Sequence, residues 1–129
     1  MGIIKLPLNV IEFLKENGGI CILGTVSKFG IVNLSPRFLL EVDSDNIVFG
    51  SGLPNKTLFN LNQNNKVCIA KWDTKLQGNI RFVMIIGTAE NYKDGEIYER
   101  ISKKFQELGF PKPLAVTVVK IEDYTFYGG

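Results

Sequence analysis

The stretch from Phe49 to Thr57, FGSGLPNKT, holds the residues best suited to binding a charged ligand. It reads as a strand that ends in Gly50 and Gly52, a turn, and the start of a helix. Glycines let backbone N–H groups approach an oxyanion, and a helix start adds unpaired N–H donors and the positive end of the helix dipole. Ser51, Lys56 and Thr57 add two hydroxyls and one positive charge. We therefore expect a phosphate site here, the alternative being a strand-turn-helix corner without a ligand.

Two better-known phosphate motifs come close to this stretch. Gly50 to Thr57 spells G-x-x-x-x-N-K-T, which lacks the second glycine of a P-loop and places Asn55 in that position. Gly50-x-Gly52 begins like a dinucleotide-binding fingerprint, but Asn55 again stands where the third glycine belongs. The parallel βαβ context that both motifs need is absent from the pattern around them. Neither a nucleoside triphosphatase nor a dinucleotide-binding domain is expected.

A second candidate segment runs from Val32 to Arg37, with Val32, Asn33, Leu34 and Ser35 ahead of a proline. Proline cannot donate to a strand ladder, so regular pairing should be disturbed at this point. Polar groups freed there could hydrogen-bond the edge of a planar ligand, and Arg37 could reach a phosphate or a ring oxygen. The alternative is a bulged edge strand that leaves Arg37 solvated.

Composition excludes several classes of function. The 129 residues include no histidine, which removes imidazole general bases, Ser-His-Asp triads and histidine-containing metal sites. Fifteen Lys and Arg against thirteen Asp and Glu give a net charge of +2, too small to suggest a nucleic-acid or membrane partner. The two cysteines, Cys21 and Cys68, lie in apolar runs without C-x-x-C spacing, and we expect both to be buried, reduced thiols.

The elements that must position these residues are mostly strands. Successive apolar, β-branched runs predict six strands: Ile20 to Val26, Ile31 to Val42, Ile47 to Phe49, Lys66 to Trp72, Ile80 to Tyr92 and Leu114 to Ile121. Three helices are predicted: Pro7 or Asn9 to Glu16 with an Asn9 cap, Pro54 to Gln63, and a helix capped by Asp94 with the stripe Ile97, Ile101, Phe105 and Leu108. Closure of six antiparallel strands removes exposed edges, so residues 1–129 should form one mainly β barrel domain with peripheral helices.

The order and spacing of these segments resemble the pyridoxamine 5′-phosphate oxidase-like superfamily of FMN-binding split barrels. The resemblance is carried by an opening Leu-Pro, FLKENG at Phe13 to Gly18, Val32-Asn33, Lys56-Thr57, and Gly87-Thr88-Ala89 with Asp94-Gly95 beyond. It covers nearly the whole chain and is closest to small bacterial FMN-binding proteins. It implies a six-stranded antiparallel split β-barrel of Greek-key type with about three helices.

The resemblance also implies where FMN would bind. Its phosphate would lie on Ser51, Gly52, Lys56 and Thr57, and its ring along Val32 to Ser35 and Phe49 to Gly50, contacted mainly through backbone atoms. The site would lie at a homodimer interface, with Tyr124 and Tyr127 of the partner chain covering the flavin. Larger pyridoxamine 5′-phosphate oxidases carry extra basic residues for a second phosphate, which have no place within these 129 positions. That specific oxidation is therefore not implied.

Together these observations predict a homodimeric FMN-binding flavoprotein, either an oxidoreductase for a small organic molecule or an electron carrier. Because FMN carries its own redox chemistry, the lack of histidine is no obstacle, and the catalytic residues stay unassigned. The alternative is a non-catalytic binding module for another phosphorylated or tetrapyrrole-like ligand.

The first residues lack the pattern of a secretory signal, and no apolar run approaches the ~18 residues that span a bilayer, so we expect a cytoplasmic protein. Arg81 should face outward, and Trp72 should contact the core or a dimer partner.

Overall fold

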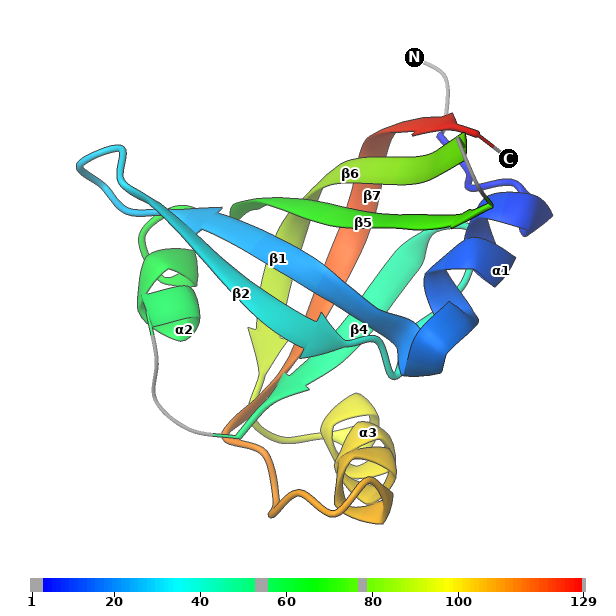
Figure 1. Cartoon of the computed structure of the whole chain (residues 1–129). Coiled ribbons are helices and arrows are strands. Elements are labelled where there is room, and N and C mark those ends of the chain that lie inside the picture. Colours follow the sequence, from blue (N-terminus) through cyan, green and yellow to red (C-terminus); the bar gives the residue numbers. More distant parts are fainter. Residues whose placement is uncertain (1–3, 53–55, 77–78, 129) are drawn as a thin grey trace.

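The computed structural model of the chain describes residues 4–52, 56–76 and 79–128. It contains seven strands: β1 (Ile20–Val26), β2 (Val32–Phe38), β3 (Glu41–Val42), β4 (Asn46–Ser51), β5 (Lys66–Leu76), β6 (Asn79–Tyr92) and β7 (Ala115–Tyr127). They form one sheet with antiparallel pairing and the order β2-β1-β5-β6-β7-β4-β3. The sheet curls around a common interior (Figure 1). The mainly β, split-barrel prediction is confirmed.

The strand count differs from the prediction because the expected strand from Ile31 to Val42 breaks in two. The N–H of Leu39 donates to the Gly19 carbonyl at 2.8 Å, and the N–H of Leu40 donates to the Val48 carbonyl at 2.8 Å. The first bond continues the β1–β2 pairing by one residue, and the second directs the chain toward β4. The two ends of the curled sheet therefore approach each other where β2 ends, which is the region of both candidate segments.

Three α-helices flank the sheet: α1 (Leu8–Lys15), α2 (Lys56–Leu61) and α3 (Glu96–Glu107). A 3-10 turn, η1 (Glu16–Gly19), follows α1. Two predicted caps are wrong, because Pro7 precedes α1 in place of Asn9, and Gly95 precedes α3 in place of Asp94. Neither residue makes a side-chain cap, and Gly95 has a φ of 93°, a conformation that glycine adopts without strain. Described helical residues of α2 begin at Lys56, and the Pro54 start lies outside the described part.

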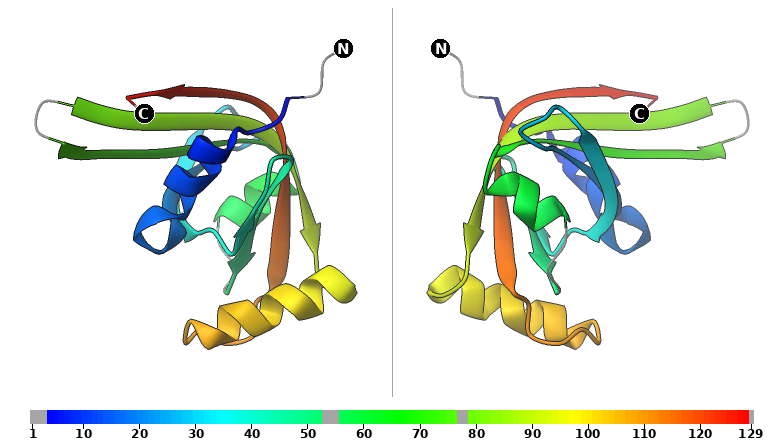
Figure 2. Two further views of the ribbon diagram at one scale, coloured as in Figure 1. Left: turned by 90° about the vertical axis from the view of Figure 1, so that its right-hand side faces the viewer. Right: turned by 90° about the vertical axis from the view of Figure 1, so that its left-hand side faces the viewer.

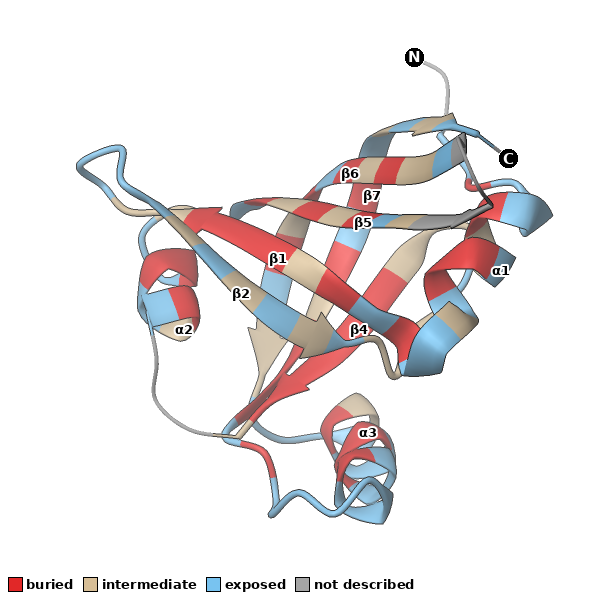
Figure 3. Cartoon of the chain, in the orientation of Figure 1, coloured by how far each residue is buried: buried red, intermediate tan, exposed pale blue. Residues whose placement is uncertain are grey.

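Two clusters of buried side chains hold the fold together (Figure 3). The larger fills the curled sheet and is closed at one end by α1, whose Val10, Phe13 and Leu14 are buried in it. The smaller lies between α3 and the β4–β7 pair and contains Val48, Tyr98, Ile101 and Val116. Burial of these apolar side chains is the main stabilising contribution. Because α3 has its own cluster, it packs as a separate block against one end of the sheet.

The last three strands are long, and their ends form an arm beyond the rest of the molecule (Figure 2). The final strand continues to Tyr127, six residues beyond the predicted end at Ile121. A bulge where Ile86 and Gly87 face β7 shifts the register. A Cβ at Gly87 would lie 2.4 Å from the Lys120 carbonyl oxygen, so this position requires glycine. Among the described residues, no helix is long and apolar enough to cross a membrane.

Candidate functional site

Strand β2 divides the predicted site residues between its two faces. Asn33, Ser35 and Arg37 are half-buried, whereas Val32 and Leu34 are 64% and 68% exposed. Alternation follows from the two-residue period of a strand. The polar row therefore faces the interior side of β2, and the apolar pair faces the outside. Any contact that Val32 and Leu34 make with a ligand on the polar side would be through their backbone.

One end of the polar row meets the start of α2. The Asn33 amide donates to the Thr57 hydroxyl at 3.2 Å, and the Ser35 and Thr57 hydroxyl oxygens lie 3.1 Å apart. Thr57 is only 1% exposed. Asn60, also on α2, donates to the Thr25 hydroxyl on β1 at 3.1 Å, which fixes the helix against the sheet. The structure thus joins three of the predicted residues into one polar cluster, and Lys56 lies exposed beside it.

The other end of the row enters a cavity of about 410 Å³. Its walls include four predicted residues, Arg37, Gly50, Ser51 and Gly52. They also include Pro36, Phe38, Phe105, Phe110 and Pro111, which the sequence analysis did not assign to a site. The predicted residues from β2 and β4 therefore come together across the opening of the curled sheet. A volume of this size is within the range of small-molecule pockets.

Two residues of the cavity wall each have a buried polar atom without a hydrogen-bond partner within the described residues: Ser51 its hydroxyl oxygen and Arg37 its Nε. Ser51 is 3% exposed. Buried polar atoms in native proteins are nearly always paired, because an unpaired one forfeits its hydration without compensation. Two such atoms on one cavity indicate a polar ligand.

The Arg37 guanidinium is positioned for an anion. Its Nη1 donates to the carbonyl of the adjacent Pro36 at 2.8 Å, and no ion pair to Arg37 is found in the described part of the chain. Burial lowers the pKa of Arg37, although the group remains charged. A half-buried cation without a carboxylate is a favourable site for an incoming negative group.

The structure gives the glycines and Phe49 a different physical role from the one expected. A Cβ at Gly50 would lie 2.9 Å from the Phe105 ring, so this glycine makes room for α3. The Phe49 side chain is fully buried in the main core, which leaves only its backbone to face a ligand. Helix α2 has only six described residues, too few for its dipole to be a strong argument.

The two tyrosines expected to cover a partner's flavin lie in β7, on opposite faces. Tyr124 packs against the main core. Tyr127 is exposed and forms a ring pair with Phe82 of β6, with centroids 5.5 Å apart. Tyr127 is therefore the better placed of the two to meet another molecule, and Phe82 joins it. Phe82 was missed because an aromatic residue in a long apolar strand gives no signal for which face it occupies.

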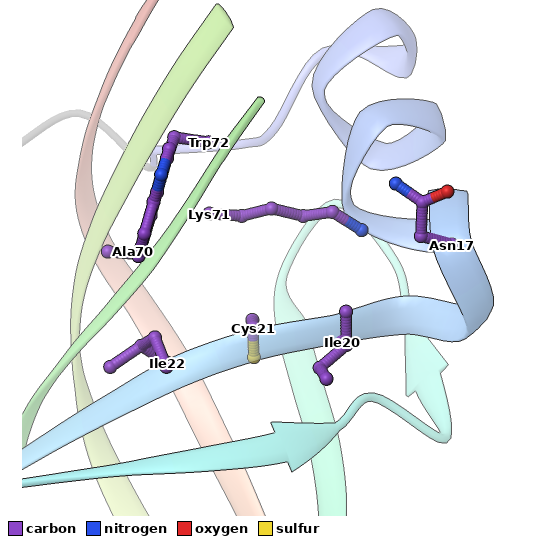
Figure 4. A pocket seen from close by; sticks show the side chains of 7 residues that line it. All are labelled: Asn17, Ile20, Cys21, Ile22, Ala70, Lys71 and Trp72. Atoms are coloured by element: carbon purple, nitrogen blue, oxygen red, sulfur yellow. The ribbon is translucent and has the colours of Figure 1, made fainter. Parts of the chain in front are cut away.

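A second cavity, of about 300 Å³, lies between η1, β1 and β5 (Figure 4). It is lined in part by Cys21, Lys71 and Trp72 and contains none of the predicted site residues. The buried Lys71 ammonium donates to the Leu14 carbonyl at 3.0 Å and to the Glu16 carbonyl. Lys71 therefore satisfies backbone carbonyls at the end of α1. We assign it a structural role.

Two further expectations are wrong, and a third is narrowed. Arg81 faces inward: its guanidinium pairs with Glu16 and Asp73 and lies 4.5 Å from the Phe13 ring centroid. Trp72 is 56% exposed, which excludes the core, and its contact with a dimer partner stays a prediction. Of the free cysteines, Cys21 is buried as expected but Cys68 is half-buried on the outer face of β5. Burial raises the pKa of the Cys21 thiol to about 12.

Comparison with known proteins agrees with this architecture. The family model described as Pyridoxamine 5′-phosphate oxidase matches residues 9–127. No curated protein matches the chain. HupZ of Group A Streptococcus is similar in structure, with a TM-score of 0.83, 22% identity and coverage of 96% of both chains. An FMN-binding protein from Syntrophomonas wolfei subsp. wolfei has a TM-score of 0.75 and 20% identity, covering 92% of this chain and 86% of that chain. A Clostridium acetobutylicum protein of the pyridoxinephosphate oxidase family, related to general stress protein 26, has a TM-score of 0.74 and 19% identity. The match covers 94% of this chain and 87% of that chain.

Proposed function

Because the chain belongs to the pyridoxamine 5′-phosphate oxidase family, we propose that it is a flavoprotein that binds FMN non-covalently, as an oxidoreductase or electron carrier. The observation that carries the proposal is the buried Ser51 hydroxyl, which has no hydrogen-bond partner among the described residues. Ser51 lines the cavity at one end of the polar row of β2, and the other end of that row bonds Thr57 of α2. An elongated ligand with a phosphate at one end suits this arrangement.

The phosphate would lie by the polar cluster of Asn33, Ser35 and Thr57, with Lys56 supplying positive charge and Ser51 a further hydroxyl. Hydroxyls, an amide and an ammonium are suitable partners for phosphate oxygens. The residues present therefore fit the group. The flavin ring would continue toward the cavity along β2 and β4, beside the backbone of Val32, Leu34 and Gly50.

Bound FMN supplies the electron-transfer chemistry. The protein's contribution is to hold the phosphate, align the ring with the β2 edge and exclude water with the apolar cavity wall. Because β2 ends the sheet order, its outer edge has backbone groups that can hydrogen-bond a planar ligand. No side chain of the cavity is assigned as an acid or base.

We also propose that the protein works as a homodimer. The outer face of the sheet carries apolar side chains across four strands: Ile20 and Ile22 of β1, Val32 and Leu34 of β2, Ala70 and Trp72 of β5, and Ile86 of β6. A hollow of about 420 Å³ on this outer face is lined almost entirely by apolar side chains. Exposed apolar surface spanning several strands is typical of protein interfaces. A second copy would cover it and bring its Tyr127 near the first copy's site.

A comparison of FMN with riboflavin tests the proposal. Riboflavin lacks the phosphate, so apoprotein should bind FMN at least about tenfold more tightly, as judged by quenching of flavin fluorescence. Lys56→Gln should reduce that preference, and Lys93→Gln, at an exposed lysine elsewhere, should leave it unchanged.

Equal affinity for FMN and riboflavin in the wild-type protein would contradict the phosphate site. Failure to bind either flavin would contradict the proposed function as a whole. In that case the cavity would belong to a binding module for another ligand.

A further inference from the structure

We propose that the 410 Å³ cavity binds a planar aromatic carboxylate, held by Arg37 and by the ring pair Phe105 and Phe110. The inference rests on the proposed function in one respect, since the ligand is taken to be the substrate that meets the flavin. The binding site itself is argued from the cavity alone.

Aromatic side chains form part of the cavity wall. Phe105 of α3 and Phe110 of the following connector stack, with centroids 4.7 Å apart and planes inclined by 21°. Phe38, at the end of β2, lies 6.2 Å from Phe110 between ring centroids. Three rings from three parts of the chain therefore line one cavity. Aromatic walls of this kind favour flat ligands, which stack on or against the ring faces.

Arg37 gives the cavity wall a positive charge. Among the described residues that line the cavity, Arg37 is the only cation and none is a carboxylate. Its Nε is buried and has no hydrogen-bond partner in the described part of the chain. A guanidinium presents its donors in a fixed plane that matches a carboxylate, so one negative group can satisfy Nε while a ring attached to it reaches the phenylalanines.

A glycine turn, a hydrogen bond and a packing contact fix the aromatic wall in place. Gly109 has a φ of 93° and directs the chain from α3 into the connector that carries Phe110. The Tyr98 hydroxyl donates to the Pro113 carbonyl at 2.5 Å, which ties the far end of the connector back to α3. Phe105 is also packed over Gly50. The aromatic wall is thus preorganised, which lowers the entropy lost when a ligand binds.

Titration calorimetry of the apoprotein with 2-naphthoate and with 2-naphthamide tests the proposal. The two probes share a ring system and differ in charge. We expect naphthoate to bind about tenfold more tightly than the amide. Arg37→Gln should abolish this preference, whereas Arg37→Lys should retain part of it. Phe110→Leu should weaken both probes about fivefold, and Phe59→Leu, at an exposed ring on α2, should weaken neither.

Equal binding of the two probes by the wild-type protein, or no binding of either, would overturn the proposal, and neither result depends on a variant that folds. An unchanged affinity in Phe110→Leu would also overturn it. The flavin result is separate: if naphthoate binds as expected and FMN does not, the cavity assignment stands and the flavoprotein proposal fails. If FMN binds and naphthoate does not, the flavoprotein proposal stands and the cavity assignment fails.

Discussion

At the scale of single residues, the site depends on side chains whose partners lie far away in the sequence. Thr57 is fixed by Asn33 and Ser35, and Gly50 is required because Phe105 of α3 occupies the space where a Cβ would be. The sequence predicted Gly50 as a close approach to an anion. It could not show the ring, because nothing local to β4 indicates which face of α3 will pack there.

Substitution at the two glycines of the candidate loop should separate packing from backbone effects. Gly50→Ala should lower the free energy of unfolding by about 1–3 kcal/mol, because the added methyl overlaps the Phe105 ring. Gly52→Ala is the matched control: its Cβ would lie at an ordinary 3.6 Å from the same ring. Urea unfolding followed by circular dichroism would measure both. A stability loss of the same size in the two variants would contradict the packing argument.

At the scale of elements, β2 and α3 decide how the site is built. The sequence located β2, and it identified the buried stripe of α3 through Ile101 and Phe105. The disturbance expected at Pro36 is wrong, because β2 pairs with β1 in an unbroken register and, as the end strand of the sheet order, it tolerates a residue without an N–H donor. The sequence did not show that the strand stops at Phe38, because the hydrogen bond that draws the chain away goes from Leu40 to Val48 of β4. Such bonds depend on how the sheet curls, which no local pattern encodes.

The contact between α3 and β3 gives a test at this scale. Glu41 accepts hydrogen bonds from Arg100 at 3.0 and 3.1 Å and from Lys104 at 2.8 Å, and these bonds lower the pKa of Glu41. Because the pKa of Glu41 is lower in the folded state than its ordinary value of 4.5, its ion pairs stabilise the folded state at pH values above 4.5. This stabilisation is lost as the pH falls through the pKa that Glu41 has in the folded state.

Glu41→Gln should therefore lower Tm by about 2 °C at pH 7. The effect is small because the Arg100 and Lys104 side chains are exposed to solvent. The difference from wild type should shrink as the pH falls below 4.5 and disappear once Glu41 is protonated in both the folded and the unfolded state. Differential scanning calorimetry across that range would measure it. A difference that persists unchanged at acid pH would show that the ion pairs are not its source.

At the scale of the whole molecule, the sheet has two apolar faces, and the described residues cover only one of them. The family resemblance implied a homodimer with the site at its interface, but it could not say which strands form that interface. The structure narrows the choice, because Trp72, Val32 and Leu34 share the outer face with Ile86.

A charge on this face should disrupt the dimer without unfolding the protomer. Leu34→Glu is expected to convert the dimer into a monomer in sedimentation velocity at micromolar concentration. The side chain at position 34 is exposed in the single protomer, but in the dimer the glutamate would be buried without an opposite charge to pair with. Leu108→Glu, at an exposed leucine at the end of α3, should remain dimeric. A wild-type protein that sediments as a monomer would refute the proposed interface.

The visible absorption spectrum of the purified protein decides whether it is an FMN-binding flavoprotein. We expect a flavin spectrum, with FMN released on heating and identified by chromatography, or the same spectrum after the apoprotein is mixed with FMN and freed of excess ligand. A protein that is colourless as purified and leaves the fluorescence of added FMN unquenched would contradict the flavoprotein proposal.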